Sequence, residues 1–310
     1  MYHYVRPPSD RLKDLKYLHI ENFRRQLDWI ATSLGFVNRE TFFACVDQGR
    51  PTSGAILTFD DGLKDHFDFV LPELKARNLW GIFYVPTGAI EAGALLDVHR
   101  IHAILACHSG AAAMDAALRV IRDDMLRDSD VEEFRRRTYL RQINDEETVL
   151  FKRTFNYYIA PAFRTDVLKQ LTDEFFGPGG ECELAKLYYL DRSQIRRLHD
   201  EGMLIGSHTV THPVMSRLSP DEQRWEIQVS FACLAEVIDA PIRTYCHPYG
   251  GFQTFTQQTE RLLEASGSLF AFNVERRDIE DADLMGHPQA LPRYDCNYFP
   301  FGTAGMAERD

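Results

Sequence analysis

The chain has 310 residues, of which 26% are charged, and its 35 basic and 46 acidic residues give a net charge of −11. This length accommodates one large hydrophobic core, and α/β barrels of this size form single domains. The acidic balance argues against nucleic acid and other polyanions as partners, because it supplies no positive footprint for phosphate groups.

Six cysteines are scattered along the chain without paired spacing, which favours reduced thiols over a disulfide framework. No run of about 18 apolar residues occurs. The first residues also lack the basic and apolar regions of an export signal. We therefore expect a cytoplasmic protein without a membrane span, and a homo-oligomer is compatible with this sequence.

The N-terminal part of the chain alternates between strand and helix patterns. Strands are predicted at residues 2–5, 55–59 and 81–85, and helices at 21–34 and within 63–77. Parallel strands joined by crossover helices follow from this alternation.

Between about residues 90 and 190 the pattern changes to long, charge-rich helical segments such as 111–126 and 131–142. The segment ends near the breaker at 177–180. We interpret it as a mainly helical insertion within a single catalytic domain that spans residues 1–310. Its aromatic-rich stretch at 151–158 suits a lid or an acceptor pocket, a dimer surface, or simple packing.

Strand and helix patterns alternate again after the insertion. One helix start is unusually clear, with Ser219 as N-cap, Pro220 at the first position and Glu222 completing a capping box. The predicted strands are 203–206, 244–247, 269–274 and 291–294, and the predicted helices are 193–200, 220–238 and 256–265. About seven βα units fit a distorted (β/α) barrel, and a doubly wound open sheet is the alternative.

Two short motifs follow predicted strands at widely separated positions. Residues 58–62 read T-F-D-D-G, and residues 208–212 read H-T-V-T-H. The carboxyl ends of parallel strands collect the chemistry of such folds. Two adjacent carboxylates and two imidazoles suit Zn²⁺ with an open position for water, although Mn²⁺, Fe²⁺, Co²⁺ and Ni²⁺ also accept these ligands. A helix-capping loop and a surface histidine pair are the alternative interpretations.

Taken together and in this order, the motifs resemble those of the polysaccharide deacetylases, the NodB-homology group that forms carbohydrate esterase family 4. The resemblance implies a (β/α) barrel in which Asp61, His208 and His212 hold a divalent metal, for which we predict zinc. It also implies that the neighbouring Asp60 accepts a proton from water. The resemblance covers about residues 1–85 and 190–293 and leaves out the insertion.

A third segment, at residues 245–251, matches the family's R-x-P-Y-G motif in its proline, tyrosine and glycine. The resemblance implies that the backbone N–H of Tyr249 stabilises an oxyanion, and the alternative is a simple turn after a strand. Cys246 occupies the motif's arginine position. Arg293, at another predicted strand end, is our candidate to replace that arginine beside Asp60, and a surface salt bridge is its alternative role.

The family also uses a histidine as general acid for the leaving amine, but its L-x-H motif is not evident here. His247, His287 and His3 are the candidates, since the pKa of histidine lies near working pH. His247 is our first assignment, and a structural role is the alternative for all three. The family's Asp-Trp motif is not evident either.

The predicted function is metal-dependent hydrolysis of an N-acyl group, N-acetyl above all, from an amino sugar or glycan precursor. A cytoplasmic location favours a nucleotide-linked, lipid-linked or small saccharide as substrate. One alternative is a deformylase of a formamido sugar. Another is a catalytically silent carbohydrate-binding protein of the same fold, because the motif arginine is replaced.

Overall fold

The computed structural model describes residues 1–8, 12–90, 93–127, 135–136, 138–139, 144–239 and 242–302. The chain divides into two compact units. The sheet unit comprises Met1–Pro8, Lys16–Ala92 and Leu187–Asp310, and the helical unit comprises Ser9–Leu15 and Gly93–Lys186. A single catalytic domain with an insertion remains a prediction.

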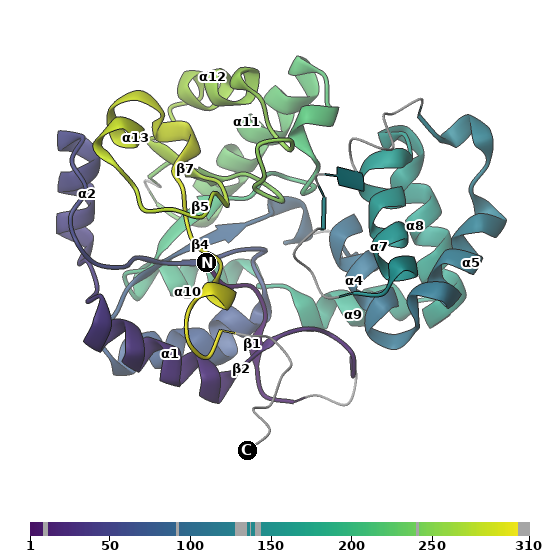
Figure 1. The fold of residues 1–310 in the computed structure, drawn as a ribbon, viewed down its shortest axis with the longest axis horizontal. Helices are drawn as coiled ribbons and strands as arrows, with labels where there is room; N and C mark the ends of the chain where they lie inside the picture. The colour runs from purple at the N-terminus through teal and green to yellow at the C-terminus, as the bar shows by residue number, and fades with distance from the viewer. Residues whose placement is uncertain are drawn as a thin grey trace. The chain divides into compact units, whose positions relative to one another are not determined.

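The centre of the sheet unit is a curled sheet of five parallel strands (Figure 1). The strands are β3 (Leu57–Phe59), β4 (Gly81–Val85), β5 (Leu204–Ser207), β6 (Thr244–Cys246) and β7 (Phe270–Phe272). They lie side by side in chain order. A doubly wound sheet would reverse its strand order at a switch point, so the predicted barrel-type α/β fold is confirmed and the open-sheet alternative is excluded.

Single bridged residues extend the sheet at both edges. Tyr2 pairs with Phe59, and Leu291 pairs with Phe272, both in parallel orientation. The predicted strand at 291–294 is therefore wrong beyond this one bridge. The strand predicted at 2–5 is divided between the Tyr2 bridge and β1 (Val5–Arg6), which pairs with β2 (Leu18–His19).

Backbone hydrogen bonds connect the first and last segments of the sheet unit. The nitrogen of Met1 donates to the carbonyl of Tyr294 over 2.6 Å, and the N–H of Cys296 donates to the carbonyl of Met1 over 3.1 Å. The side-chain amide of Gln26, which is fully buried, also donates to the carbonyls of Cys296 and Pro300, each over 3.0 Å. These contacts place Arg293 beside the start of the chain.

Helices pack around this sheet because its strands carry apolar side chains toward them. The ring of Phe59 stacks on Phe83 at 4.6 Å and on Tyr2 at 5.4 Å, and Tyr2 in turn meets Phe23 of the first helix. The helices are α1 (Ile20–Ser33), α2 (Arg39–Gln48), the π-helix η1 (His66–Val70), α3 (Leu71–Ala76), α10 (Arg192–Asp200), α11 (Pro220–Val237), α12 (Gln257–Ala265) and α13 (Asp281–Gly286). Neither α2 nor α13 was predicted.

The helical unit agrees with the helical content predicted for residues 90–190. Its helices are α4 (Asp97–Cys107), α5 (Gly110–Val120), α7 (Glu146–Arg153), α8 (Pro161–Phe176) and most of α9 (Gly180–Tyr188). The helix predicted at 111–126 ends at Val120, and the one predicted at 131–142 lies largely outside the described residues. Phe151 and Phe155 are fully buried, which favours simple packing for the aromatic stretch.

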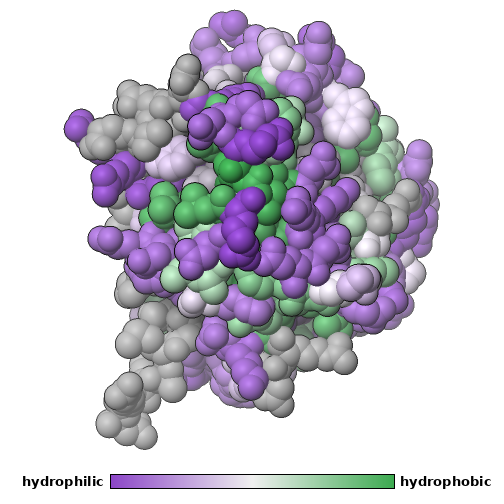
Figure 2. Space-filling model, turned by 90° about the vertical axis from the view of Figure 1, so that its right-hand side faces the viewer, coloured by the Kyte–Doolittle hydropathy of each residue, from purple (hydrophilic) through white to green (hydrophobic). Residues whose placement is uncertain are grey.

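Some apolar side chains of the helical unit reach the surface. Leu118, Leu126 and Leu150 are all more than 40% exposed. Figure 2 views the molecule from the side of α5 and α8, where hydrophobic side chains gather between hydrophilic ones. Within the described part of the chain, every helix is too short or too polar to cross a membrane.

Candidate metal centre

The two motifs meet at one edge of the sheet. Asp60 and Asp61 follow β3 directly, and His208 follows β5 directly. Because all five strands are parallel, their carboxyl ends lie at the same edge. The fold therefore brings together residues that are about 150 positions apart in the sequence.

Asp61, His208 and His212 form a compact buried group. One carboxylate oxygen of Asp61, Oδ1, lies 3.4 Å from Nε2 of each histidine. All three residues are at most 4% exposed. Zinc ligands at ordinary bond lengths in a tetrahedron stand about 3.3 Å apart, so these donor atoms fit a divalent metal.

A hydrogen bond orients the first histidine of the group. The Nδ1 atom of His208 lies 2.8 Å from the carbonyl of Cys246, so an Nδ1–H donor leaves Nε2 directed at Asp61. Burial favours the neutral ring, but the acidic neighbours Cys246, Asp61 and Asp60 raise the pKa of His208 well above its ordinary value. A metal ion held at this nitrogen would have to displace a proton.

The backbone around the group is held in unusual conformations. Asp61, Thr209, His212 and Tyr249 have φ angles of 77°, 68°, 56° and 61°. Residues with side chains rarely adopt this left-handed region, at a cost of about 1–3 kcal/mol each. Such strain clusters at functional sites, where surrounding contacts fix it.

Arg293 holds the second carboxylate in place. Its guanidinium donates to both oxygens of Asp60, from Nη1 over 2.9 Å and from Nη2 over 2.5 Å, and also donates to Thr58 and to the carbonyl of Asn273. Burial alone would raise the pKa of Asp60. The charge and hydrogen bonds of Arg293 outweigh burial and hold that pKa well below its ordinary value. The surface salt bridge considered for Arg293 is excluded, because Arg293 is 8% exposed.

Cys246 lies beside this pair. Its sulfur is 2.7 Å from Nη2 of Arg293 and 3.5 Å from Oδ2 of Asp60. Asp60, His208 and Cys246 form a second group with metal-ligand chemistry, but the guanidinium already supplies the positive charge there. Burial raises the pKa of the Cys246 thiol, which disfavours it as a nucleophile.

The structure separates the three general-acid candidates. His247 stacks on Phe255 at 3.8 Å, and its Nε2 lies 2.7 Å from the carbonyl of Gln289. Burial lowers the pKa of His247 to about 3. This geometry does not support our first assignment, since a ring that packs and bonds in this way has a structural role. His287 is exposed at the end of α13, where its charge acts on Glu260 and Asp283.

His3 lies on the side of the sheet that carries Asp60. The rings of Tyr2 and Phe59 stack on the helix side of the sheet, and side chains alternate between faces along a strand. His3, one residue after Tyr2, therefore faces the same way as Asp60, one residue after Phe59. In agreement, the charge of His3 is among those that lower the pKa of Asp60.

Tyr249 lies against the Asp-His-His group. Its ring contacts that of His212 at a centroid distance of 4.9 Å. The loop after β6 is fixed by a hydrogen bond from the N–H of Val274 to the carbonyl of Gly250, whose missing Cβ leaves room for the Val274 side chain. The oxyanion role of the Tyr249 N–H remains a prediction.

One buried residue near the site was not singled out in the sequence. Glu226 of α11 accepts hydrogen bonds from the loop between His208 and His212. A signal was present, because Glu226 falls on the buried face of α11 between Ile227 and Gln223, where a carboxylate is unusual.

The fold and the buried Asp-His-His group together define an α/β half-barrel protein with a metal-type site at the carboxyl edge of its sheet. The sequence model of the family described as polysaccharide deacetylase matches residues 165–267, which include the second and third motifs. A chitin deacetylase of Arthroderma benhamiae is 28% identical over 101 residues. That match spans 32% of this chain and 27% of the relative's own length.

Solved structures, deacetylases among them, share the fold of most of the chain. They include PplD of Streptococcus pyogenes, solved with acetate (TM-score 0.57, 15% identity, 95% of this chain and 89% of that one). IcaB of Ammonifex degensii has a TM-score of 0.52 at 17% identity, over 94% of this chain and 88% of its own. A de-N-acetylase of Aggregatibacter actinomycetemcomitans has a TM-score of 0.52 at 13% identity, over 94% of this chain and 92% of its own. These findings confirm the resemblance to the polysaccharide deacetylases that the motifs predicted.

Proposed function

We propose that the chain is a metal-dependent hydrolase that removes an N-acyl group, N-acetyl above all, from an amino sugar or saccharide. The observation that carries this proposal is the position of Asp61 Oδ1 at 3.4 Å from both histidine Nε2 atoms, with a second carboxylate fixed beside them by Arg293. The similarity to carbohydrate deacetylases supports the choice of substrate class.

Asp61, His208 and His212 would hold the metal, and the two-nitrogen, one-oxygen donor set favours zinc. A bound divalent cation polarises the amide carbonyl and makes water a better nucleophile. Asp60 has a different role from Asp61, because Arg293 binds both of its oxygens and keeps it ionised. It is therefore ready to accept a proton from the attacking water, while the N–H of Tyr249 stabilises negative charge on the former carbonyl oxygen.

The leaving amine requires a proton when the C–N bond breaks. We assign this general-acid role to His3, which faces the same way as Asp60 and whose carbonyl accepts a hydrogen bond from His66 over 3.0 Å. The proton passes from the ring to the amine nitrogen, the carbonyl carbon keeps the water oxygen, and the products are a carboxylate and a free amino sugar. The ring then recovers a proton from solvent, and Asp60 releases to solvent the proton that it accepted from water.

A leaving-group comparison tests the role of His3. Phenolic acetate esters with good leaving groups need little protonation, whereas amides need it strongly. His3→Ala is therefore expected to lose roughly 100-fold or more in amide hydrolysis and to keep most of its aryl-esterase activity and its bound metal. Equal losses on both substrates would contradict the assignment.

The proposed activity is tested by measuring bound metal, acetate, formate and free amine with a panel of N-acylated amino sugars. Asp60→Asn keeps the shape of the side chain and should retain the metal while losing about 100-fold or more in rate. Release of formate instead of acetate would favour a formamido-sugar deformylase. Metal binding without amine release from any substrate would favour the silent carbohydrate-binding protein. The cytoplasmic location remains part of this proposal.

A further inference from the structure

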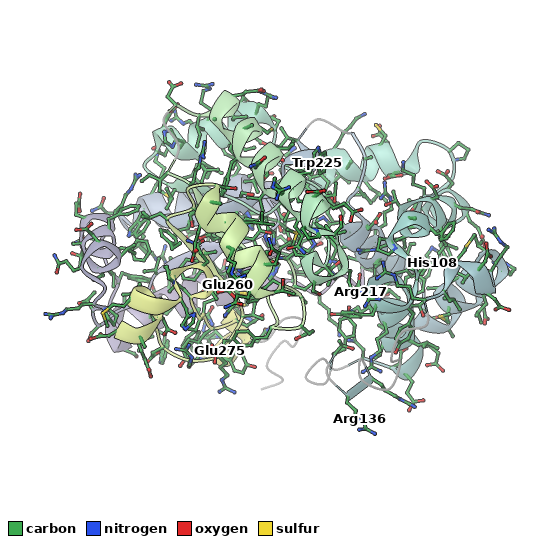
Figure 3. All side chains as sticks on the ribbon, turned by 90° about the horizontal axis from the view of Figure 1, so that it is seen from above. His108, Arg136, Arg217, Trp225, Glu260 and Glu275 are labelled. Carbon is green, nitrogen blue, oxygen red and sulfur yellow. The ribbon has the colours of Figure 1, made fainter. Side chains whose placement is uncertain are left out.

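Helix α11 carries a buried polar face. Gln223, Glu226 and Ser230 are at most 4% exposed, whereas Trp225 on the same helix, labelled in Figure 3, is 50% exposed. Buried polar side chains are costly unless they are hydrogen bonded. Glu226 and Ser230 bond to the segment at residues 207–212, which we call the histidine loop, whereas Gln223 bonds elsewhere.

Glu226 binds the part of the loop that lies between the two histidines. Its Oε2 accepts hydrogen bonds from the backbone N–H groups of Val210 and Thr211, over 2.7 and 3.0 Å. Its Oε1 accepts from the hydroxyl of Thr211 over 2.5 Å. Two successive N–H groups that converge on one oxygen form an anion-binding nest, so the carboxylate fixes the local backbone.

Ser230, one helical turn after Glu226, contacts the start of the same loop. Its hydroxyl lies 2.6 Å from that of Ser207, which accepts a hydrogen bond from the N–H of Thr209 over 3.1 Å. The loop is thus attached to α11 at two points, and Glu226 supplies three of these hydrogen bonds.

The loop needs such support because two of its residues have unfavourable backbone angles. Thr209 and His212 have φ angles of 68° and 56°, and such angles persist only where surrounding contacts impose them. One contact lies inside the loop, where the N–H of His212 donates to the hydroxyl of Thr209 over 2.8 Å. Further contacts come from α11 and from the segment after β4, where the N–H groups of Thr87 and Gly88 donate to the carbonyls of Thr209 and Val210, each over 2.9 Å.

We propose that Glu226 is a positioning residue for metal binding. Through Val210 and Thr211 it holds the histidine loop in the conformation that places Nε2 of His208 and of His212 within 3.4 Å of Asp61 Oδ1. Glu226 therefore sets the metal affinity of the site without touching the metal. This inference rests on the proposed metal-dependent function.

The test compares metal binding by three variants of the full chain. Glu226→Ala removes all three hydrogen bonds, and Glu226→Gln keeps the shape and one acceptor oxygen. Gln223→Ala is the matched control, because Gln223 is equally buried one turn earlier on α11, while its side chain bonds, among the described residues, to Thr259 and the carbonyl of Leu218. Zn²⁺ and Co²⁺ affinities are measured on metal-free protein, with the visible spectrum of the Co²⁺ form and the thermal midpoint.

Glu226→Ala is expected to bind metal about 10- to 100-fold more weakly and to change the Co²⁺ spectrum. Glu226→Gln should recover part of the affinity, and Gln223→Ala should lower the thermal midpoint with wild-type affinity. Wild-type affinity in Glu226→Ala, or equal losses in both alanine variants, would overturn the inference. If Glu226→Ala does not fold, wild-type affinity and spectrum in Glu226→Gln would overturn it. Absence of metal binding by the wild-type chain would overturn the proposed function, and the inference with it.

Discussion

Arg293 determines the protonation state of Asp60. A carboxyl group whose pKa is lowered in the folded state stays ionised at all pH values above that pKa, so Asp60 produces no loss of activity between pH 5 and 9. Arg293→Met removes both hydrogen bonds to the Asp60 carboxylate and the positive charge of the guanidinium. Burial then raises the pKa of Asp60. We expect a loss of roughly 100-fold or more in kcat/KM at pH 7 and an acid limb that moves to higher pH.

A pH–rate profile checks this prediction, with Thr58→Val as the control that removes only one of the hydrogen bonds of Arg293. An acid limb at the same pH in wild type and Arg293→Met would contradict it. Arg293→Lys keeps the charge without the two-pronged geometry, and an intermediate effect is expected.

The sequence predicted the residues of the site unevenly. Asp60, Asp61, His208 and His212 stand in short motifs after apolar runs, so local reasoning was sufficient. The pairing of Arg293 with Asp60 spans 233 positions and was predicted only as one of two roles. His247 was our first general-acid assignment, and the choice between it and His3 depends on how the first segment pairs with β3, which local sequence does not show.

At the scale of the element, the start of α11 agrees with its prediction. Ser219 and Glu222 exchange the hydrogen bonds of a capping box, and Pro220 occupies the first turn. Ser219→Ala should lower the free energy of unfolding by about 1 kcal/mol, and Ser219→Gly by only a few tenths, because both remove the side-chain acceptor but glycine better exposes the backbone to water.

Chemical denaturation measures this difference. Equal stability of Ser219→Ala and the wild type would show that the cap contributes nothing.

For helices and strands with a strong local pattern, the predicted ends lie within one or two residues of the observed ones. The prediction for β4 matches at both ends. By contrast, α2 buries only Phe42 among its described residues, so it has no apolar stripe to detect. The strand predicted at 291–294 has an apolar start, but among the described residues it forms a β-bridge at Leu291 and continues only with a hydrogen bond from the N–H of Arg293 to the carbonyl of Glu275.

At the scale of the whole molecule, two neutral histidines make stability depend on pH. Burial lowers the pKa of His66 to about 4 and that of His247 to about 3. Below pH 6.5 the unfolded chain binds protons at both positions and the folded chain does not, so stability falls with pH. At pH 5 each histidine should cost roughly 2 kcal/mol relative to neutral pH.

Denaturation of the metal-free chain between pH 7 and 5 tests this effect. His208 has a raised pKa and acts in the opposite direction, because near pH 7 the unfolded chain has released a proton that the folded chain keeps. It offsets the loss by less than about 1 kcal/mol. His247→Asn should reduce the slope of the unfolding free energy against pH, because about one proton fewer is taken up on unfolding. A free energy of unfolding that stays constant from pH 7 to 5 would contradict the prediction.

The order of the strands follows from the simple alternation of strand and helix in the sequence, which favours neighbours in chain order. The contacts that join Met1 to Tyr294 and Cys296 do not follow from it. They are made by backbone atoms, which carry no side-chain signal.

Metal content measures the central claim most directly. The purified chain, loaded with Zn²⁺ and dialysed, should retain one equivalent by elemental analysis, and Asp61→Ala and His212→Ala should retain little. Asp60→Asn changes the residue next to Asp61 and should keep the full equivalent of zinc. An absence of bound metal in the wild type, or an equal metal content in Asp61→Ala and wild type, would contradict the account.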